Sequence, residues 1–475
     1  MIVDNASSTC TCTTFHYSLF TSIHVFVNNN QISKRNAWGF TILILLTFIC
    51  RKHGETSVAS MEVPRERERE SVYVTRPRSL YKRDPGALLH QPEGPNSGYL
   101  VLQDQEAETY GCFGLCKKGI GNLPFPQNRN LTIDYAVSTG QSSVVYQDAV
   151  IFIPVLNQPL SSNRYYVMLR KGEHQGEAST CSKEEDMGTC LCCTYIKDVK
   201  SRPLNPPGEY QQFEIRKTRW GFQGKSIVSD GFAPQFLRRK GWTLSTKTPR
   251  HYQLGEALGI NPALRAVLPP FTFPSSSNCS QPVVVGKWYS PFMFVKEEGV
   301  SVKEQMKRSV FYEMTLQRRW DRVFSKENDG KINEVLVDVV VKTEVAGLGD
   351  GREAVWEEGK VGEEGVMWFK SLERGERKVG LRMEIVERMR WEEERADWEG
   401  KNSGKKQVRF ERTEKLEGSS GIVWRNFGFY VLVESFVLKR MDGSIVLTCD
   451  FRHSIMSSAR GSELVMIVIF YVFDF

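Results

Sequence analysis

The sequence lacks the short motifs that mark several enzyme classes. It contains no G-x-x-x-x-G-K-[ST] phosphate loop, no H-E-x-x-H zinc helix and no G-x-S-x-G nucleophile elbow. Histidine is scarce, and between residues 73 and 453 the chain has only His90, His174, His251 and His453. The nearest candidate for a catalytic Cys–His pair is His174 with Cys181. These absences favour a binding or interaction protein over an enzyme.

Long hydrophobic runs are also missing. The apolar segment from Ala37 to Cys50 has fourteen residues, fewer than the roughly 20 that span a bilayer. It resembles the core of a signal peptide, but it follows a long leader and precedes no A-x-A-like cleavage site. Strict Arg-Glu alternation follows at residues 65–70, as a GA dinucleotide repeat would encode. We therefore expect residues 1–71 to be an N-terminal extension; the alternative, a signal anchor, would place the protein at a membrane.

Neither sign of charge dominates. The chain has 63 basic and 56 acidic residues, a net charge of +7, and the two signs are interspersed. This pattern is typical of a solvated surface and gives no evidence for nucleic-acid binding, which gathers basic residues on one face. Eleven cysteines at irregular spacing do not form a secreted disulfide framework. We expect a reducing location, the cytoplasm or the nucleus and cytoplasm.

The clearest structural signal is a hairpin at residues 427–451. Two apolar runs flank Asp442 and Gly443, and Asp-Gly between such runs predicts a tight turn with both residues at positive φ. The first run is apolar on both faces, so we expect it to be covered on both sides at the centre of the main sheet. Residues 407–414 are expected to complete that sheet.

Further strands and two helices complete the prediction. Turn residues separate short strand candidates at residues 99–103, 131–137, 149–155, 164–169 and 209–217. Ser301 and Glu304 form a capping-box pattern. The helix that they open should run to about Phe324, with the positions 306, 310, 314, 320 and 324 buried and Arg318 mostly off that stripe. A second helix is predicted at residues 381–398, burying Leu381, Ile385 and Met389.

These patterns predict a β-dominated α+β protein, with antiparallel sheets in two lobes and a few amphipathic helices. We place the N-terminal β-rich lobe at residues 72–268, a Pro/Ser-rich linker at 269–282 and the C-terminal α+β lobe at 283–453.

Several runs resemble a plant-specific family catalogued as domain of unknown function 1262. The matching runs are residues 73–77, 79–82, 93–101, 123–128, 151–163, 236–242, 285–289, 311–316, 383–389, 430–434 and 438–444. The resemblance covers about residues 72–453 and implies that residues 1–71 are an extension and that 454–475 are a divergent tail. It implies no established activity, cofactor or catalytic residue.

The cysteines are the sharpest chemical feature. Cys112 and Cys116 form a C-x-x-x-C pattern, and Cys190 and Cys192 lie in a C-x-C-C cluster downstream. Four thiolates from two loops could hold zinc tetrahedrally. The alternatives are burial as small hydrophobic side chains, S-acylation or redox chemistry.

Three other patterns have a structural explanation. The glycines of residues 347–351 are interpreted as a turn, because Arg352 stands where a dinucleotide fingerprint needs its third glycine. The basic residues Arg238, Arg239 and Lys240 beside Trp242 resemble a phosphate contact, but they also suit the last turn of a helix predicted at residues 232–242. Acidic runs at residues 184–186 and 392–394 are interpreted as solvated faces.

The leading hypothesis is a non-enzymatic module that binds a protein or a small-molecule ligand. The alternatives are a cysteine-dependent enzyme or zinc-stabilised module, and a lipid-surface protein that uses the segment from Ala37 to Cys50. Zinc is the one cofactor that the sequence suggests.

Overall fold

The computed structural model describes residues 72–469, with internal gaps. These gaps are residues 105–109, 112–115, 118, 139, 141, 191–192, 251–252, 275–276, 329–333, 357–364, 373–377, 396–405, 416–424 and 461–466. The chain divides into two compact units, Met1–Arg65 and Glu66–Phe475. The described residues belong to the second unit, so the predicted extension at residues 1–71 lies outside them. No helix within the described residues has the length and apolar character to cross a membrane.

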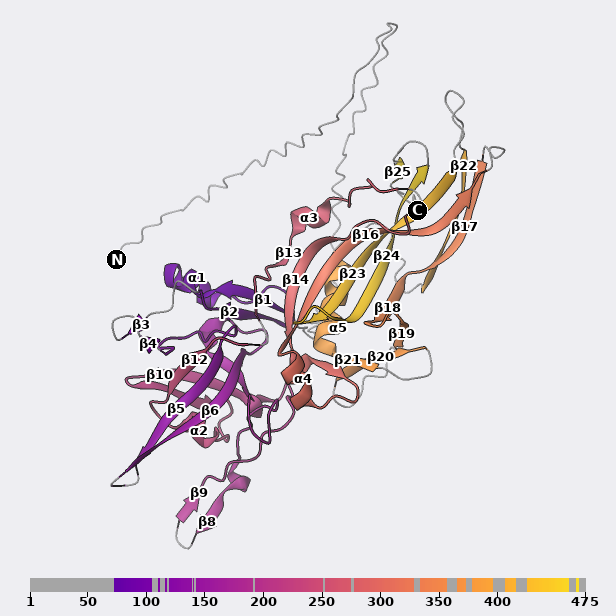
Figure 1. The fold of residues 1–475 in the computed structure, drawn as a ribbon. Helices are drawn as coiled ribbons and strands as arrows, with labels where there is room; N and C mark the ends of the chain where they lie inside the picture. Colours follow the sequence, from indigo (N-terminus) through magenta and orange to yellow (C-terminus); the bar gives the residue numbers. More distant parts are fainter. Residues whose placement is uncertain are drawn as a thin grey trace, which may run out of the picture. The chain divides into compact units, whose positions relative to one another are not determined.

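A large sheet dominates the described residues, which confirms the β-dominated fold class (Figure 1). Neighbouring strands in it are antiparallel, except β1 and β2, which are parallel. Its strand order is β15 (Val295–Glu297), β21 (Lys378–Arg382), β20 (Val366–Ser371), β19 (Glu353–Trp356), β18 (Glu344–Leu348), β24 (Ile445–Arg460), β23 (Asn426–Arg440), β16 (Phe311–Glu327), β14 (Val283–Pro291), β1 (Val72–Pro77) and β2 (Ser97–Leu102). Two short strands add to β14 and β24, namely β13 (Gly259–Ile260) and β25 (Ile467–Ile469).

The predicted hairpin is confirmed as β23 and β24 at the centre of this sheet. From Phe427 to Leu438 every residue of β23 is buried, as two apolar faces require. The turn differs in one detail from the prediction: Gly443 has φ +85°, but Asp442 does not adopt a positive φ. The N–H of Gly443 donates to the carbonyl of Arg440 at 2.9 Å, so a single left-handed residue closes the turn.

The long helix predicted from Ser301 is wrong beyond its first two turns. The Ser301 hydroxyl does cap the helix α4 (Val302–Arg308), accepting from the N–H of Glu304 at 3.2 Å. The strand β16 then follows, and Trp320 is buried on it. Met314 and Trp320 have even numbers, so they share one face of this strand as well as one stripe of a helix. The expected position 306 lies in α4, position 310 precedes the strand, and a bulge between Arg322 and Phe324 interrupts the alternation before position 324. Arg318 has the same parity and is fully buried, which corrects its predicted place off the core stripe.

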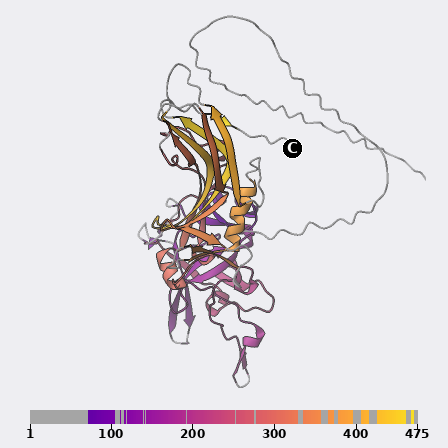
Figure 2. The same ribbon diagram turned by 90° about the vertical axis from the view of Figure 1, so that its right-hand side faces the viewer.

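The second predicted helix is confirmed as α5 (Met383–Arg395), which buries Ile385 and Met389. Leu381 is buried too, but it belongs to β21. Figure 2 shows α5 lying against the large sheet. The predicted strand at residues 407–414 is β22 (Gln407–Lys415), but it pairs with β17 (Glu334–Lys342) in a separate two-stranded sheet and does not complete the main one. Buried and exposed residues alternate along β17, and its buried valines pack on one face of β23. The pair of β17 and β22 therefore covers the main sheet and does not extend it.

A second, six-stranded sheet is built from the N-terminal half of the chain. Its order is β11 (Gly221–Ser226), β10 (Gln212–Thr218), β7 (Arg164–Leu169), β6 (Ser143–Pro154), β5 (Asn130–Ser138) and β12 (Thr243–Lys247). An isolated bridge joins Phe222 of the edge strand β11 to Trp242, the residue before the other edge strand β12, and both belong to an aromatic core. The remaining elements are α1 (Arg78–Arg83), α2 (Gln235–Arg238), α3 (Pro262–Ala266) and two hairpins, β3 (Tyr110–Gly111) with β4 (Cys116–Lys117) and β8 (Gly188–Cys190) with β9 (Cys193–Tyr195).

The two sheets share one core. Ile153 of β6 and Tyr166 of β7 belong to the same buried cluster as Tyr73 of β1 and Trp288 of β14. The strands β1 and β2 come from the predicted N-terminal lobe, yet they pair with each other and β1 pairs with β14. Sheet membership therefore crosses the predicted linker at residues 269–282.

Candidate functional site

A glutamate lies at the centre of the apolar strand β23. Glu434 has no exposed surface, although Val433 and Phe436 beside it are core residues. Its two carboxylate oxygens accept from the guanidinium of Arg265, at 3.0 Å from Nε to Oε1 and through a second bond from Nη2 to Oε2. Arg265 lies in α3 and is also buried. This two-point contact is the strongest geometry for an arginine–carboxylate pair.

A second arginine completes the environment of Glu434. The Nε of Arg318, on the neighbouring strand β16, lies 3.3 Å from Oε1 of Glu434. Its Nη1 donates to the carbonyl oxygens of Arg265 and Val267, so it also fixes the end of α3. Burial lowers the pKa of Arg318, and the negative charge of Glu434 opposes that shift.

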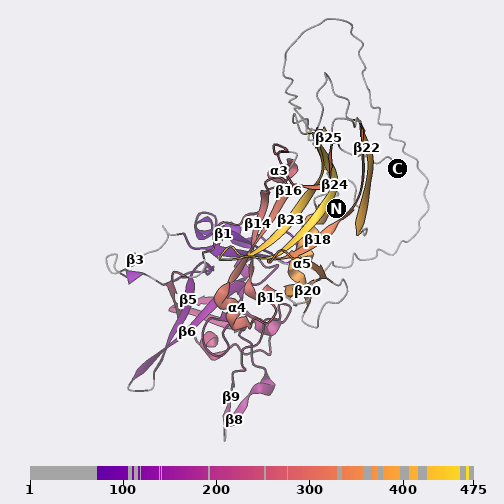
Figure 3. The ribbon, with the colours of Figure 1, turned by 45° about the vertical axis from the view of Figure 1, so that its right-hand side comes forward.

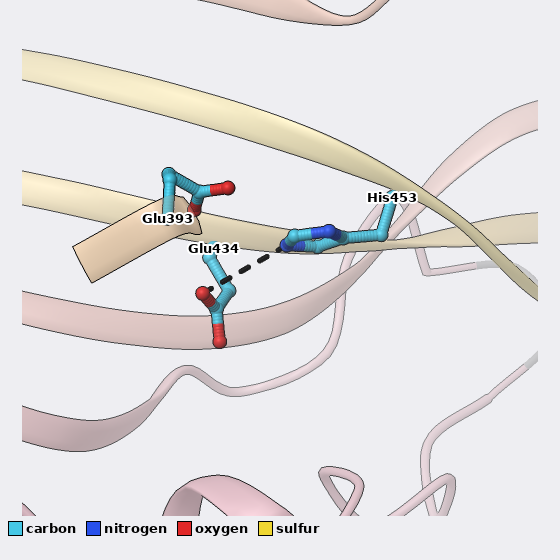
Figure 4. Close-up of side chains that lie close together, drawn as sticks. All are labelled: Glu393, Glu434 and His453. Carbon is cyan, nitrogen blue, oxygen red and sulfur yellow. Dashed lines mark ion pairs between the residues drawn. The ribbon is translucent and has the colours of Figure 1, made fainter. Parts of the chain in front are cut away.

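Glu393 and His453 approach the same carboxylate from two other elements (Figure 4). Glu393 comes from α5 and His453 from β24, and one ligand-type atom of each lies within 4.8 Å of the other two and of one oxygen of Glu434. The Nε2 of His453 lies 3.8 Å from Oε2 of Glu434. Of all His, Cys, Asp and Glu in the described residues, these three form the group with the spacing of metal ligands.

Burial and neighbouring charges separate the protonation states of this group. Burial, and then the charge of Glu434, raise the pKa of Glu393 well above its ordinary value. Burial also opposes ionisation of Glu434, but its contacts with Arg265 outweigh that cost and lower its pKa. Burial lowers the pKa of His453 to about 4, so its imidazole is neutral at pH 7.

The network continues along α5. Glu392 is almost fully buried, so its predicted place on a solvated face is wrong. Its backbone carbonyl accepts from Nη1 of Arg265 at 2.9 Å. Its Oε1 accepts from Nη2 of Arg388 at 2.6 Å. The other terminal nitrogen of Arg388 donates to the hydroxyl of Ser97 at 2.7 Å and to the carbonyl of Glu93 at 3.0 Å. The buried charges thus join α5 to α3, to the sheet centre and to the start of β2.

This donor set suits a fixed ion-pair network better than a cation. Three guanidinium groups, those of Arg265, Arg318 and Arg388, already compensate the buried carboxylates. A metal ion bound to an oxygen of Glu434 would compete with Arg265 for that oxygen and would add positive charge beside two arginines. The geometry therefore supports a structural role for the cluster, with a neutral imidazole at its edge beside a carboxyl whose pKa burial raises.

The predicted zinc site is not tested by the structure. Cys112 and Cys192 lie outside the described residues. Cys116 belongs to β4 and the exposed Cys190 to β8, so two of the four residues are placed on different hairpins. Zinc coordination by Cys112, Cys116, Cys190 and Cys192 stays a prediction.

The candidate Cys–His pair has other contacts. Nδ1 of His174 lies 2.7 Å from Oε2 of Glu177. Cys181 is buried, and burial raises the pKa of its thiol to about 11. A thiol with so high a pKa is a poor nucleophile at neutral pH.

The basic and glycine-rich motifs serve local structure. Arg238 ends the single turn of α2, where its guanidinium pairs with Asp198 and donates to the carbonyl of Ala233 at 2.8 Å. Arg239 lies over the ring of Tyr135. Of the glycines in residues 347–351, Gly347 lies in β18, and Gly349 and Gly351 lie in the turn between the antiparallel strands β18 and β19, where Gly351 has φ +85°.

Sequence reasoning missed Glu434, Arg318 and Arg265. Glu434 carried a signal, because it interrupts a strand that is otherwise apolar on both faces, and a charge there needs a buried partner. Arg318 carried a weaker one, since it alternates with Leu316 and Trp320. Nothing local to Arg265 indicates burial, because its partner is distant in the sequence.

Comparison with known proteins identifies a family for part of the chain. Residues 93–194 match the model of a family described as "Protein of unknown function (DUF1262)". This match confirms the resemblance in that segment; restriction of the family to plants is untested. No curated protein matches the chain. Among solved structures, the crystal structure of Cry35Ab1 is similar, at 11% identity and a TM-score of 0.37, over 70% of this chain and 90% of that one. A similarity this distant assigns no function.

Proposed function

We propose that the protein is a non-enzymatic binding module that holds an extended segment of a partner protein against the outer edge of β6. The support comes from the hairpin arm formed by β5 and β6, which belongs to the segment that matches the family.

The arm extends beyond the strands that flank it (Figure 1). The β5–β6 ladder continues to the pair Ser138 and Ser143. On one side, β12 accompanies β5 only as far as Asp134. On the other side, the β6–β7 ladder begins at Val150. Among the described residues, the outer edge of β6 from 143 to 148 therefore has no neighbouring strand, and this is the observation that carries the proposal.

The side chains of this edge suit an apolar partner. Val145 is 63% exposed, and Val144 and Tyr146 are exposed on either side of it. Exposed strand edges are normally protected by charges, especially lysine. Residues 135–147 contain no acidic or basic side chain. Asp148 ends the unpaired edge, so an uncharged segment with alternating apolar residues would meet no charged side chain of β6 along residues 143–147.

Ring contacts brace the base of the arm, and pre-organisation of this kind lowers the entropic cost of binding. The rings of Tyr135 and Tyr146 stack with their centroids 5.4 Å apart. The guanidinium of Arg239 also contacts the Tyr135 ring, at 5.4 Å from its centroid. An extended peptide that adds to such an edge gains affinity from main-chain hydrogen bonds and specificity from alternate side chains.

A displayed peptide library selected on the full chain tests this proposal. Peptides with alternating apolar residues should be enriched, and Val145→Lys should weaken their binding at least tenfold because it places a charge on the edge. Leu336→Lys is the matched control, since Leu336 is 61% exposed on β17. It should leave binding unchanged.

Two results would overturn the proposal. One is equal binding of the selected peptides to the wild type and to Val145→Lys. The other is concentration-dependent dimerisation in sedimentation that Val145→Lys abolishes, because the edge would then serve a second copy of this chain.

A further inference from the structure

The hairpin of β8 and β9 brings two exposed cysteines face to face. It forms a two-stranded sheet of its own, with the pairs Gly188–Tyr195, Thr189–Thr194 and Cys190–Cys193 (Figure 3). Both thiol-bearing side chains are exposed. The sequence pattern paired Cys190 with Cys192 as metal ligands, whereas the register of the hairpin places Cys193 opposite Cys190.

This register has the spacing of a disulfide. Directly opposed residues in antiparallel strands have Cα atoms about 4.5–5.5 Å apart. Disulfides join Cα atoms that are about 4.4–6.8 Å apart. The Cα spacing of the Cys190–Cys193 register therefore lies in the disulfide range, and closure of the bond requires the two Cβ atoms, about 4.5–5.5 Å apart in opposed residues, to approach by about 1 Å.

We propose that Cys190 and Cys193 are an oxidisable dithiol, converted to a disulfide by a peroxide. The thiolate of one cysteine attacks a peroxide oxygen, breaking the O–O bond and leaving a sulfenic acid and one water. The thiolate of the other then attacks the sulfenic sulfur, forms the S–S bond and releases a second water. The two thiols lose two electrons and two protons in total, and hydrogen peroxide is reduced to two waters.

The other described cysteines lack this arrangement, and Cys116 lies opposite Gly111 in its hairpin. Cys181 and Cys449 are buried, and burial raises the pKa of both thiols. Cys279 is exposed but pairs in register with Asp321 through an isolated bridge. Reactivity toward an oxidant requires an exposed thiol, and a disulfide requires a second thiol opposite it, so the hairpin is the favoured place for this reaction.

Oxidation would stabilise the β8–β9 hairpin, which has little stability of its own. A lone two-stranded hairpin is marginally stable in water. At its open end the ring of Tyr195 covers Gly188, where an added Cβ would meet the ring at 2.4 Å. A disulfide would close the turn end, so the hairpin would be held at both ends.

The test uses the full chain with Cys192→Ser, so that only Cys190 and Cys193 remain in the hairpin. After treatment with hydrogen peroxide, both cysteines should lose their ability to be alkylated, and the peptide that contains them should lose two hydrogen atoms in mass. Amide exchange of residues 188–195 should slow at the same time. With Cys193→Ser added to the Cys192→Ser chain, Cys190 should stay open to alkylation or become a sulfenic acid. With Cys279→Ser added instead, Cys190 and Cys193 should form the disulfide as before.

The proposal is overturned if both thiols of the Cys192→Ser chain stay open to alkylation, or if each is oxidised singly. It is also overturned if the wild type forms a disulfide through Cys192 while the Cys192→Ser chain stays reduced.

Discussion

A buried guanidinium is stable only where its charge is compensated, and Arg318 meets this condition through Glu434 and two backbone carbonyls. Replacing Arg318 with leucine would leave Glu434 with a single arginine partner and expose the carbonyls at the end of α3 to an apolar side chain. We expect Arg318→Leu to lower the free energy of unfolding by about 3–5 kcal/mol, measured by urea denaturation.

The matched control for this substitution is Arg216→Leu. Arg216 pairs with Glu214 on β10, and this pair is exposed to solvent. The free energy of unfolding should therefore hardly change in Arg216→Leu. Equal losses for the two variants would show that burial of the Arg318–Glu434 pair has no energetic consequence.

His453 predicts a pH dependence of stability. Its folded pKa, lowered by burial to about 4, lies below the ordinary value of 6.5. Between these values the unfolded chain binds a proton that the folded chain does not, so stability is lost as the pH falls. Relative to His453→Gln, the wild type should lose up to about 3 kcal/mol between pH 6.5 and pH 4.

The comparison with a variant isolates this effect from its neighbours. The lowered pKa of Glu434 also makes the protein less stable as the pH falls, whereas the raised pKa of Glu393 makes it more stable as the pH falls. Urea denaturation across this pH range measures the difference, with His174→Gln as the control at a partly buried site. A pH-independent difference between the wild type and His453→Gln would contradict the assignment.

At the scale of elements, the β23–β24 turn depends on one backbone conformation. Gly443 has φ +85°, and an added Cβ would meet no atom within 4 Å. The cost of Gly443→Val would therefore be backbone strain without a steric clash, about 1–3 kcal/mol. Gly121→Val is the control, because Gly121 is equally open but does not have a positive φ. Thermal denaturation should show a lower Tm for Gly443→Val alone.

The sequence was sufficient for elements with one strong local pattern. The hairpin at Gly443, the start of α4 at Ser301 and the helix α5 all follow from residues within a few positions. The strand β16 was not predictable in this way, because its even-numbered apolar residues fit a helical stripe and a strand face equally. Its neighbours β14 and β23 decided the outcome by pairing with it along its length.

The candidate site was less accessible to sequence reasoning than the fold. The anomaly of Glu434 can be read from its apolar surroundings, but its partner Arg265 is 169 positions away along the chain. Only the packing of α3 against the sheet brings the two together. The same limit applies to Cys190 and Cys193, whose opposition depends on the register of β8 and β9.

At the scale of the whole described unit, Tyr73 connects the two sheets. It lies in β1, is fully buried, and donates its hydroxyl to the carbonyl of Pro154 in β6 at 2.7 Å. Tyr73→Ala should cost about 3–5 kcal/mol. Because both sheets contribute to the same core, hydrogen exchange should speed up in β6 and β14 together.

Tyr195→Ala is the control for this prediction, since Tyr195 is exposed on β9 and should affect neither sheet. Faster exchange in only one sheet of the Tyr73→Ala chain would mean that the two sheets unfold independently.

The pairing of β1 with β14 also constrains the order in which a growing polypeptide can fold on the ribosome. Tyr73 must wait for its partner Tyr289, which is made 216 residues later. At about 5–20 residues per second this delay lasts roughly 10–40 s. The strands of the six-stranded sheet all emerge within that interval. The strand β1 can pair with β2 as soon as residues 97–102 are made, but its contact with β14 thus forms only after the strands of the six-stranded sheet have emerged.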